Sequence, residues 1–413
     1  MPKRFWCSSS FFVAVLISGL LISAPLLWPS NAALNFLTQV CITAVLALSF
    51  NLLLGQTGLL SFGHAVYAGF GAYAAIYALN QVSAGIWFLP VSLVPIIGGL
   101  SGLFFGMLFG WISSKQSGLT FSMISLGIGE LVFAGSAMFP TVFGGEGGKS
   151  ANRVVGETWM GITFGPQIEI TYLIIFWTLI AAGTMFFVTK TPLGKLANAV
   201  KENEERVAFL GVNPRYVRFL MLCISCFFAG VAGALSALHF EMATTDSFSL
   251  ARSGAILFFT YIGGVSVFLG PVVGAILAVV MSVFLSELTP AWQLYLGLLF
   301  MFVVSFAPHG VSGMLLSWID AAKGAKRQSH LSGLLVWTSL WLSASTFLCC
   351  GGVMMIELLY RWRFPSETFH PLVAFGITLA PHNNSSWLIT SSSFVVGLVA
   401  LKMVGQCRRR GQQ

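Results

Sequence analysis

Long apolar runs separated by short polar segments dominate this chain, and many of them approach the ~20 residues that an α-helix needs to cross a lipid bilayer. Several runs are shorter or contain glycine and proline. The pattern predicts an all-α, polytopic membrane bundle with broken or short helices, about ten spans in the core and two more near the C-terminus. The candidate spans lie near residues 11–29, 33–54, 58–80, 87–111, 118–139, 170–189, 219–239, 254–268, 271–286, 292–307, 331–356 and 386–404.

Composition supports this prediction. Charged residues make up 8% of the 413 residues and hydrophobic residues 56%, whereas globular proteins carry about 25% charged residues. The stretch from Phe5 to Ser114 contains no Lys, Arg, Asp or Glu, and His64 is its only group that titrates near neutral pH. Such a chain is too apolar for a disordered protein, and seven scattered Cys residues do not make a disulfide scaffold.

The net charge of +8 raises the question of nucleic-acid binding. If the N-terminus and the C-terminus are both cytoplasmic, however, most Lys and Arg residues fall on the cytoplasmic side, as the positive-inside rule requires. We therefore expect no nucleic-acid partner. The first span resembles a cleavable signal sequence, but its removal would put the remaining spans out of step with the basic loops, so we expect a retained helix.

Small residues recur every four positions in two spans. Membrane helices associate by close backbone approach at such positions, so we interpret both stripes as packing surfaces. They consist of Gly98, Gly102, Gly106 and Gly110 in the fourth span and of Ser225, Ala229, Gly233 and Ala237 in the seventh.

Two segments, 51–71 and 261–274, place Gly, Ser or Pro inside apolar sequence. Broken helices in transporters commonly flank the translocation path, which makes Ser61, Gly263 and Gly264 pathway candidates. Ordinary tight turns are an equal alternative for either break alone.

Two ionisable residues lie within apolar spans, His64 and Glu130. Such residues are costly in lipid and often functional, so both are pathway candidates. A structural role, in which His64 bonds a carbonyl and Glu130 is protonated or paired, is the competing interpretation.

A polar stretch at residues 139–169 is predicted on the outer side and contains the run from Gly144 to Ser150. A phosphate-binding loop would require glycine where Phe143 stands. We predict a flexible outer loop, with Gly144, Gly145 and Glu146 as candidates for a gate or for docking.

The most charged segment, residues 189–219, follows the sixth span. Thr191 and Pro192 predict a helix start, and Gly211 predicts its left-handed end. Glu202 and Arg206 are spaced for an i, i+4 ion pair. This cytoplasmic helix is either a solvated connector or a docking surface.

Taken together, these motifs resemble the permease subunits of branched-chain amino acid ABC importers, and specifically the longer of the two related permeases. The resemblance runs from about residue 30 to 316 and rests on segment 51–75, the FGGEGG loop, segment 191–219 and segment 261–275. It implies a permease domain at 1–320 and a two-span extension at 321–413. It also implies a prokaryotic inner membrane, a second permease, two cytoplasmic ATP-binding subunits and a periplasmic or extracellular substrate-binding protein. The implied ATPase-coupling residues are Glu202, Glu204, Glu205, Arg206, Ala208 and Gly211.

The expected function is import of branched-chain or other apolar amino acids, with no enzymatic activity, cofactor or metal in this chain. The pair Cys223 and Cys226 stands within an apolar helix without further metal ligands nearby. Urea or short amides are an alternative substrate class. An ion-coupled secondary transporter and a purely structural membrane protein are alternative functions.

Overall fold

The computed structural model describes residues 9–154, 163–286, 292–306 and 310–313, together with short stretches beyond residue 350. The predicted span at 331–356 and that at 386–404 lie largely outside the described residues. The described chain forms two compact units. The first comprises Met1–Phe284 and Leu299–Met314, and the second Leu285–Leu298 and Leu315–Gln413.

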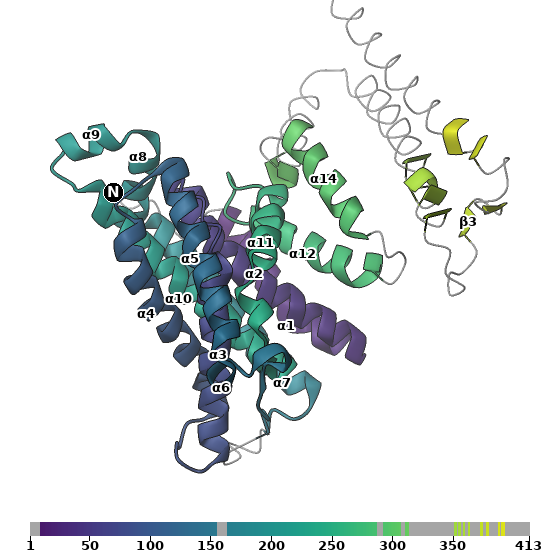
Figure 1. The fold of residues 1–413 in the computed structure, drawn as a ribbon, viewed down its shortest axis with the longest axis horizontal. Helices are drawn as coiled ribbons and strands as arrows, with labels where there is room; N and C mark the ends of the chain where they lie inside the picture. Colours follow the sequence, from purple (N-terminus) through teal and green to yellow (C-terminus); the bar gives the residue numbers. More distant parts are fainter. Residues whose placement is uncertain are drawn as a thin grey trace, which may run out of the picture. The chain divides into compact units, whose positions relative to one another are not determined.

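Helices make up nearly all of the first unit (Figure 1). Its elements begin with α1 (Ser9–Leu27), α2 (Asn31–Thr57), α3 (His64–Ser83), η2 (Val91–Leu93), α4 (Val94–Ser113), α5 (Gly118–Met138), α6 (Pro140–Phe143), η3 (Gly145–Gly147) and β1 (Lys149–Ser150). They continue with α7 (Gln167–Lys190), α8 (Pro192–Glu202), α9 (Glu204–Phe209), α10 (Pro214–Phe240), β2 (Met242–Ala243), η4 (Thr245–Phe248), α11 (Leu250–Gly263), α12 (Gly270–Val280) and the π-helical turn η5 (Met281–Leu285).

Helix α14 (Trp292–Phe306) follows in the chain, and residues 299–306 of it belong to the first unit. In the second unit, β3 (Leu372–Ala374) pairs antiparallel with β4 (Ile377–Leu379), and Met354 and Leu358 pack with Trp387.

Ten of the described helices overlap the ten predicted core spans. Five of the described helical segments are long and apolar enough to cross a membrane: 31–57, 91–113, 118–138, 167–190 and 214–240. Shorter apolar helices include Leu250–Gly263 and Gly270–Leu285. A helical membrane bundle with short helices is therefore confirmed.

Among the membrane-length helices of the first unit, α2 and α10 are the most buried. Helix α10 packs against α2, α3 and α4. An added Cβ at Gly102 would lie 2.4 Å from the carbonyl oxygen of Cys226, and one at Gly98 would lie 2.4 Å from Cβ of Ala234. On another side of α10, an added Cβ at Gly233 would lie 1.8 Å from the carbonyl oxygen of Ala68 in α3. Both small-residue stripes are thus packing surfaces, as predicted.

The first predicted break is real, but it is not a surface turn. Helix α2 ends at Thr57, where Gly58 takes a left-handed conformation (φ 70°), and α3 begins at His64. Between them Leu59 and Ser61 are 2% and 1% exposed. Because buried backbone must be satisfied internally, the segment is held by neighbours: the Phe62 N–H donates to Oγ of Ser125 in α5 (3.0 Å).

The second break separates two antiparallel short helices, α11 and α12. Gly264 (φ 109°) ends α11 in a conformation that favours glycine. An added Cβ at Gly263 would lie 2.2 Å from the carbonyl oxygen of Gly270. Helices α11 and α12 therefore approach each other closely beside this turn.

Candidate functional site

The charged segment 189–219 folds into two helices before α10, α8 and α9, instead of the single helix predicted from the sequence. Asn203 causes the difference, because its extended backbone ends α8 and its side chain accepts a hydrogen bond from the Arg206 N–H (2.8 Å), which caps α9. Glu202 and Arg206 therefore belong to different helices, and the predicted i, i+4 pair is wrong. The predicted start is confirmed: Thr191 caps α8 through the Gly194 N–H, with Pro192 next. Gly211 is left-handed, as predicted (φ 81°).

One side of α8 and α9 is fixed to the ends of the membrane helices. Lys201 Nζ donates to the carbonyl of Gly55 in α2 (3.0 Å), and Asn198 donates to Oε1 of Gln56 (2.7 Å). Glu204 forms a 2.7 Å ion pair with Arg218 in α10. The side chain of Val207, in α9, is buried. Movement of α8 and α9 is thus linked directly to α2 and α10.

The other side of this segment is open. Glu202, Glu205, Arg206, Ala208 and Gly211 are exposed. At the end of α9, Phe209 is 90% exposed and Leu210 is 75% exposed. Large apolar side chains beside charged groups are typical of a protein-binding surface. Five of the six predicted coupling residues therefore lie on the open side, whereas Glu204 belongs to the fixed one.

Electrostatics distinguish Glu204 from its neighbours. The hydrogen bond from Arg218 lowers the pKa of the Glu204 carboxyl below its ordinary value, against the opposing effect of partial burial. The Arg218 side chain is only 4% exposed. The pair therefore fixes an ionised carboxylate on α9 to a buried cation in α10.

The first break contains two of the predicted pathway residues, Ser61 and His64, and both are fully enclosed (1% and 0% exposed). His64 Nε2 lies 2.9 Å from Oγ of Ser49, which itself donates to the Leu46 carbonyl. Since a hydroxyl has one proton, His64 Nε2 is the donor, and Nδ1 is left without a partner among the described residues. Ser225 of α10 donates to the Ser49 carbonyl (2.6 Å).

The remaining pathway candidates are placed differently. Gly263 is buried in the α11–α12 contact, and Gly264 forms the turn beside it. Glu130, by contrast, lies on the exposed side of α5. The structure thus does not bring the five candidates into one cavity.

The predicted flexible outer loop is a folded structure in its described part. Strand β1 pairs antiparallel with β2, and Gly144, Gly145 and Gly148 take left-handed conformations. The side chain of Glu146 lies outside the described part. Asn80 donates to the Ser150 carbonyl (3.3 Å). The loop is therefore fastened to the outer ends of α3 and α10.

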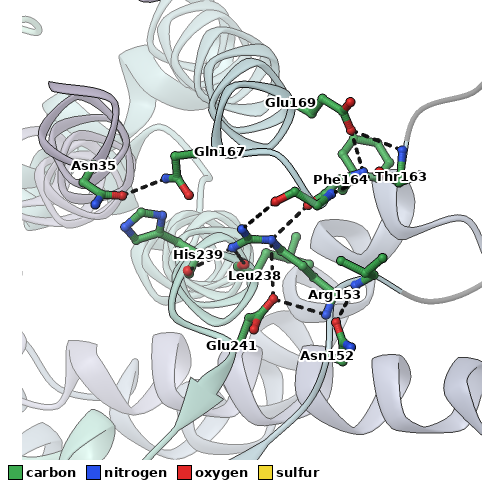
Figure 2. A network of polar contacts seen from close by, with 12 residues as sticks. Asn35, Asn152, Arg153, Thr163, Phe164, Gln167, Glu169, Leu238, His239 and Glu241 are labelled. Carbon is green, nitrogen blue, oxygen red and sulfur yellow. Dashed lines mark hydrogen bonds and ion pairs between the residues drawn. The ribbon is translucent and has the colours of Figure 1, made fainter. Parts of the chain in front are cut away.

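Figure 2 shows Arg153 as the centre of this fastening. Its guanidinium donates to the carbonyls of Phe164 (2.9 Å) and Gly165 (3.1 Å) and pairs with Glu241 (3.4 Å) at the end of α10. Glu169 of α7 accepts from the Phe164 N–H (2.7 Å). One side chain thus connects the outer loop to α10 and to the start of α7.

Residues 32–305 match the family model described as "Branched-chain amino acid transport system / permease component". This match covers more than half of the chain. The chain belongs to this family.

Two curated relatives are similar to this permease. The "High-affinity branched-chain amino acid transport system permease protein LivM" of Escherichia coli K12 is 26% identical over 341 residues, covering 77% of this chain and 78% of the relative. The protein of the same name from Salmonella typhimurium LT2 is 25% identical over 311 residues, covering 70% and 72%. The resemblance to the longer permease is therefore confirmed. No solved structure matches the chain.

Three arginines of this permease were not recognised as site residues from sequence. In the structure, Arg218 and Arg153 hold α9 and the outer loop to the two ends of α10, and Arg252 lies in the first turn of α11. No pattern within a single helix marks the ion pairs of Arg153 and Arg218, because Glu241 and Glu204 belong to other elements.

No group of three or more His, Cys, Asp or Glu side chains suited to hold a metal ion occurs within the described ranges. Cys223 and Cys226 are buried free thiols in α10. Cys226 faces the glycine stripe of α4, where an added Cβ at Gly106 would lie 2.6 Å from its Cβ.

Proposed function

We propose that this permease is the membrane subunit of an ATP-driven importer of branched-chain amino acids, and that α8 and α9 receive the force generated by ATP-binding subunits. The main support is the two-sided structure of this segment. One side is bonded to α2 and α10, and the other presents Glu202, Glu205 and Arg206 next to the exposed Phe209 and Leu210.

The energy source belongs to other subunits. The sequence contains no phosphate-binding loop, so two cytoplasmic ATP-binding subunits supply the free energy. Their closure moves α8 and α9, and the bonds to Gly55 and Arg218 carry this movement into α2 and α10. Differential binding to two conformations then biases the bundle toward inward-open or outward-open states.

The orientation follows from the position of this segment. With α8 and α9 in the cytoplasm, an even number of spans leaves both termini there, in the inner membrane of a prokaryote. The loop around Gly144, Gly145 and Glu146 then faces outward, where a substrate-binding protein docks. Ser61, His64, Gly263 and Gly264 support the broken helices that flank the translocation path, whereas Glu130 belongs to the exposed face of α5.

A second, homologous permease covers α5. The exposed face of α5 carries Met123 and Leu131 (70% and 69% exposed) but also Gly127 and the carboxylate of Glu130. A carboxylate facing lipid costs a few kcal/mol. The outward face of α4 instead consists of apolar residues such as Leu100, Phe104 and Leu108, which suits lipid.

Reconstituted vesicles test the proposal. The complete importer, with its ATP-binding subunits and binding protein, should accumulate L-leucine only when ATP is supplied on the side of α8 and α9. Gly211→Pro should abolish this uptake while the protein still reaches the membrane, because proline cannot adopt the positive φ of this position. Accumulation by the permease alone under a cation gradient, without nucleotide, would overturn it.

A further inference from the structure

Arg252 is half-buried and lies at the level of the first turn of α3, although it directly follows an outer segment in the sequence. It belongs to the first turn of α11, and the next residue, Ser253, accepts a hydrogen bond through Oγ from the Ala65 N–H of α3 (3.1 Å). Between the outer end of α10 and this point, the chain descends along α3, where Phe248 packs against Gly69 and stacks on Tyr73.

Positions along the neighbouring helix α2 and along α11 itself give the depth of Arg252 in the bundle. His64, at the start of α3, contacts Ser49 of α2, and Ser49 is about 12 Å from the Thr57 end of a helix that is about 40 Å long. Along α11, Arg252 is about 16 Å from Gly263 at the opposite end of the helix. Both measures place Arg252 within the hydrocarbon layer.

Among the described residues, no acidic side chain forms an ion pair with Arg252. Its Nη1 donates to Oγ of Ser247 (3.3 Å). The two ion pairs formed among the described residues, Arg153–Glu241 and Arg218–Glu204, do not involve it. A charge without an ion pair at this depth is costly, so the site favours an anionic partner.

The surroundings increase the positive potential. Arg252 stands in the first turn of α11, where a helix carries partial positive charge and disfavours a cation. The first turn of α3 meets α11 at the Ala65–Ser253 bond, so a second helix N-terminus lies at the same level.

We propose that Arg252 binds the carboxylate of the transported amino acid as it passes between the start of α3 and the start of α11. The inference rests on the proposed function. A guanidinium binds a carboxylate through two parallel N–H···O bonds, and the N-termini of broken helices in transporters point at anionic substrate groups. All branched-chain amino acids share this carboxylate, so one arginine serves the whole class.

Ligand-induced stabilisation of the purified importer, without its binding protein and without ATP, tests the site directly. L-Leucine and 4-methylpentanoate, which carry the carboxylate, should raise the melting temperature, whereas L-leucinamide, which lacks it, should not. Arg252→Gln should weaken leucine binding about tenfold or more. Arg215→Gln, which removes an arginine from the first turn of α10, is the matched control and should leave leucine binding unchanged.

Two results would overturn the proposal: equal stabilisation of the wild-type importer by leucine and leucinamide, or unaltered leucine binding by Arg252→Gln. If Arg252→Gln does not assemble, the comparison of ligands on the wild type decides alone. If Arg252 instead forms a structural pair with Glu130, Glu130→Gln and Arg252→Gln should be equally unstable without ligand. L-Leucine should then still raise the melting temperature. Absence of ATP-driven uptake by wild-type vesicles would refute the proposed function. The comparison of ligand binding would still test the role of Arg252.

Discussion

Arg218 illustrates how one residue joins α9 to the helix bundle. It is almost completely buried near the start of α10, and its Nε has no hydrogen-bond partner among the described residues. Its main compensation is the 2.7 Å contact with Glu204. A buried cation that loses its anion is destabilising, so this pair makes the attachment of α9 dependent on the ionisation of one carboxyl.

The pH dependence of this attachment is a first prediction. Because the folded-state pKa of Glu204 is lowered, its contribution to stability is complete above the ordinary carboxyl pKa and is lost as pH falls through the lowered value. Hydrogen exchange at residues 204–209 should accelerate in that acidic range. Glu204→Gln should produce the same acceleration at neutral pH and cost about 1 kcal/mol, less than a fully buried pair because Glu204 is partly exposed.

Glu205→Gln is the control, since this neighbouring carboxylate is exposed and does not contact Arg218. It should leave hydrogen exchange at α9 unchanged. Equal effects of the two substitutions would show that general charge, and not the ion pair, holds the segment.

At the scale of elements, α10 depends on the absence of side chains in α4. Every fourth residue of α4 from Gly98 to Gly110 lacks the Cβ that would otherwise collide with α10. In lipid, where the hydrophobic effect does not drive helices together, this close approach supplies the packing energy. The α4–α10 contact is therefore more sensitive to added volume than an ordinary apolar interface.

The second prediction compares two glycine substitutions. Gly102→Ala places a Cβ 2.4 Å from the Cys226 carbonyl oxygen, and such overpacking costs about 1–3 kcal/mol. We expect a lower melting temperature in detergent. Gly183→Ala in α7, where nothing lies within 4 Å of the added Cβ, should be neutral or stabilising because alanine favours helix. An unchanged melting temperature of Gly102→Ala would show that α4 and α10 move apart at little cost to accommodate the added methyl group.

At the scale of the whole molecule, the exposed faces of the first unit indicate how it assembles. α4 offers lipid an apolar face, whereas α5 exposes a carboxylate beside a glycine. A second identical copy bound through this face would bring a second Glu130 carboxylate into the same interface, and like charges disfavour such a homodimer. We therefore expect a non-identical membrane partner at α5.

Assembly provides the third prediction. Gly127→Trp on the exposed face of α5 should block co-purification of the second permease, because small residues permit close helix approach. Leu100→Trp on α4, which is 54% exposed, should leave co-purification unchanged. Retention of the partner by Gly127→Trp would place the subunit interface elsewhere.

Local features were predictable from the sequence where neighbouring residues decide them. The caps at Thr191 and Pro192, the left-handed Gly211 and the two small-residue stripes all depend on interactions within one helix or on side-chain volume. The division at Asn203 was missed because the apolar pattern continues across it, although Asn is itself a strong cap residue.

By itself, the sequence determined the helical membrane class, the positions of the core helices and the family, since these follow from hydrophobic length, glycine spacing and ordered motifs. Only the tertiary structure decided that Glu204 is bonded and Glu205 free, that His64 is enclosed while Glu130 is exposed, and that Arg252 lies at the level of the first turn of α3. The physical reason is that burial and pairing of a charge depend on partners from distant parts of the chain, which periodicity along a single helix does not record.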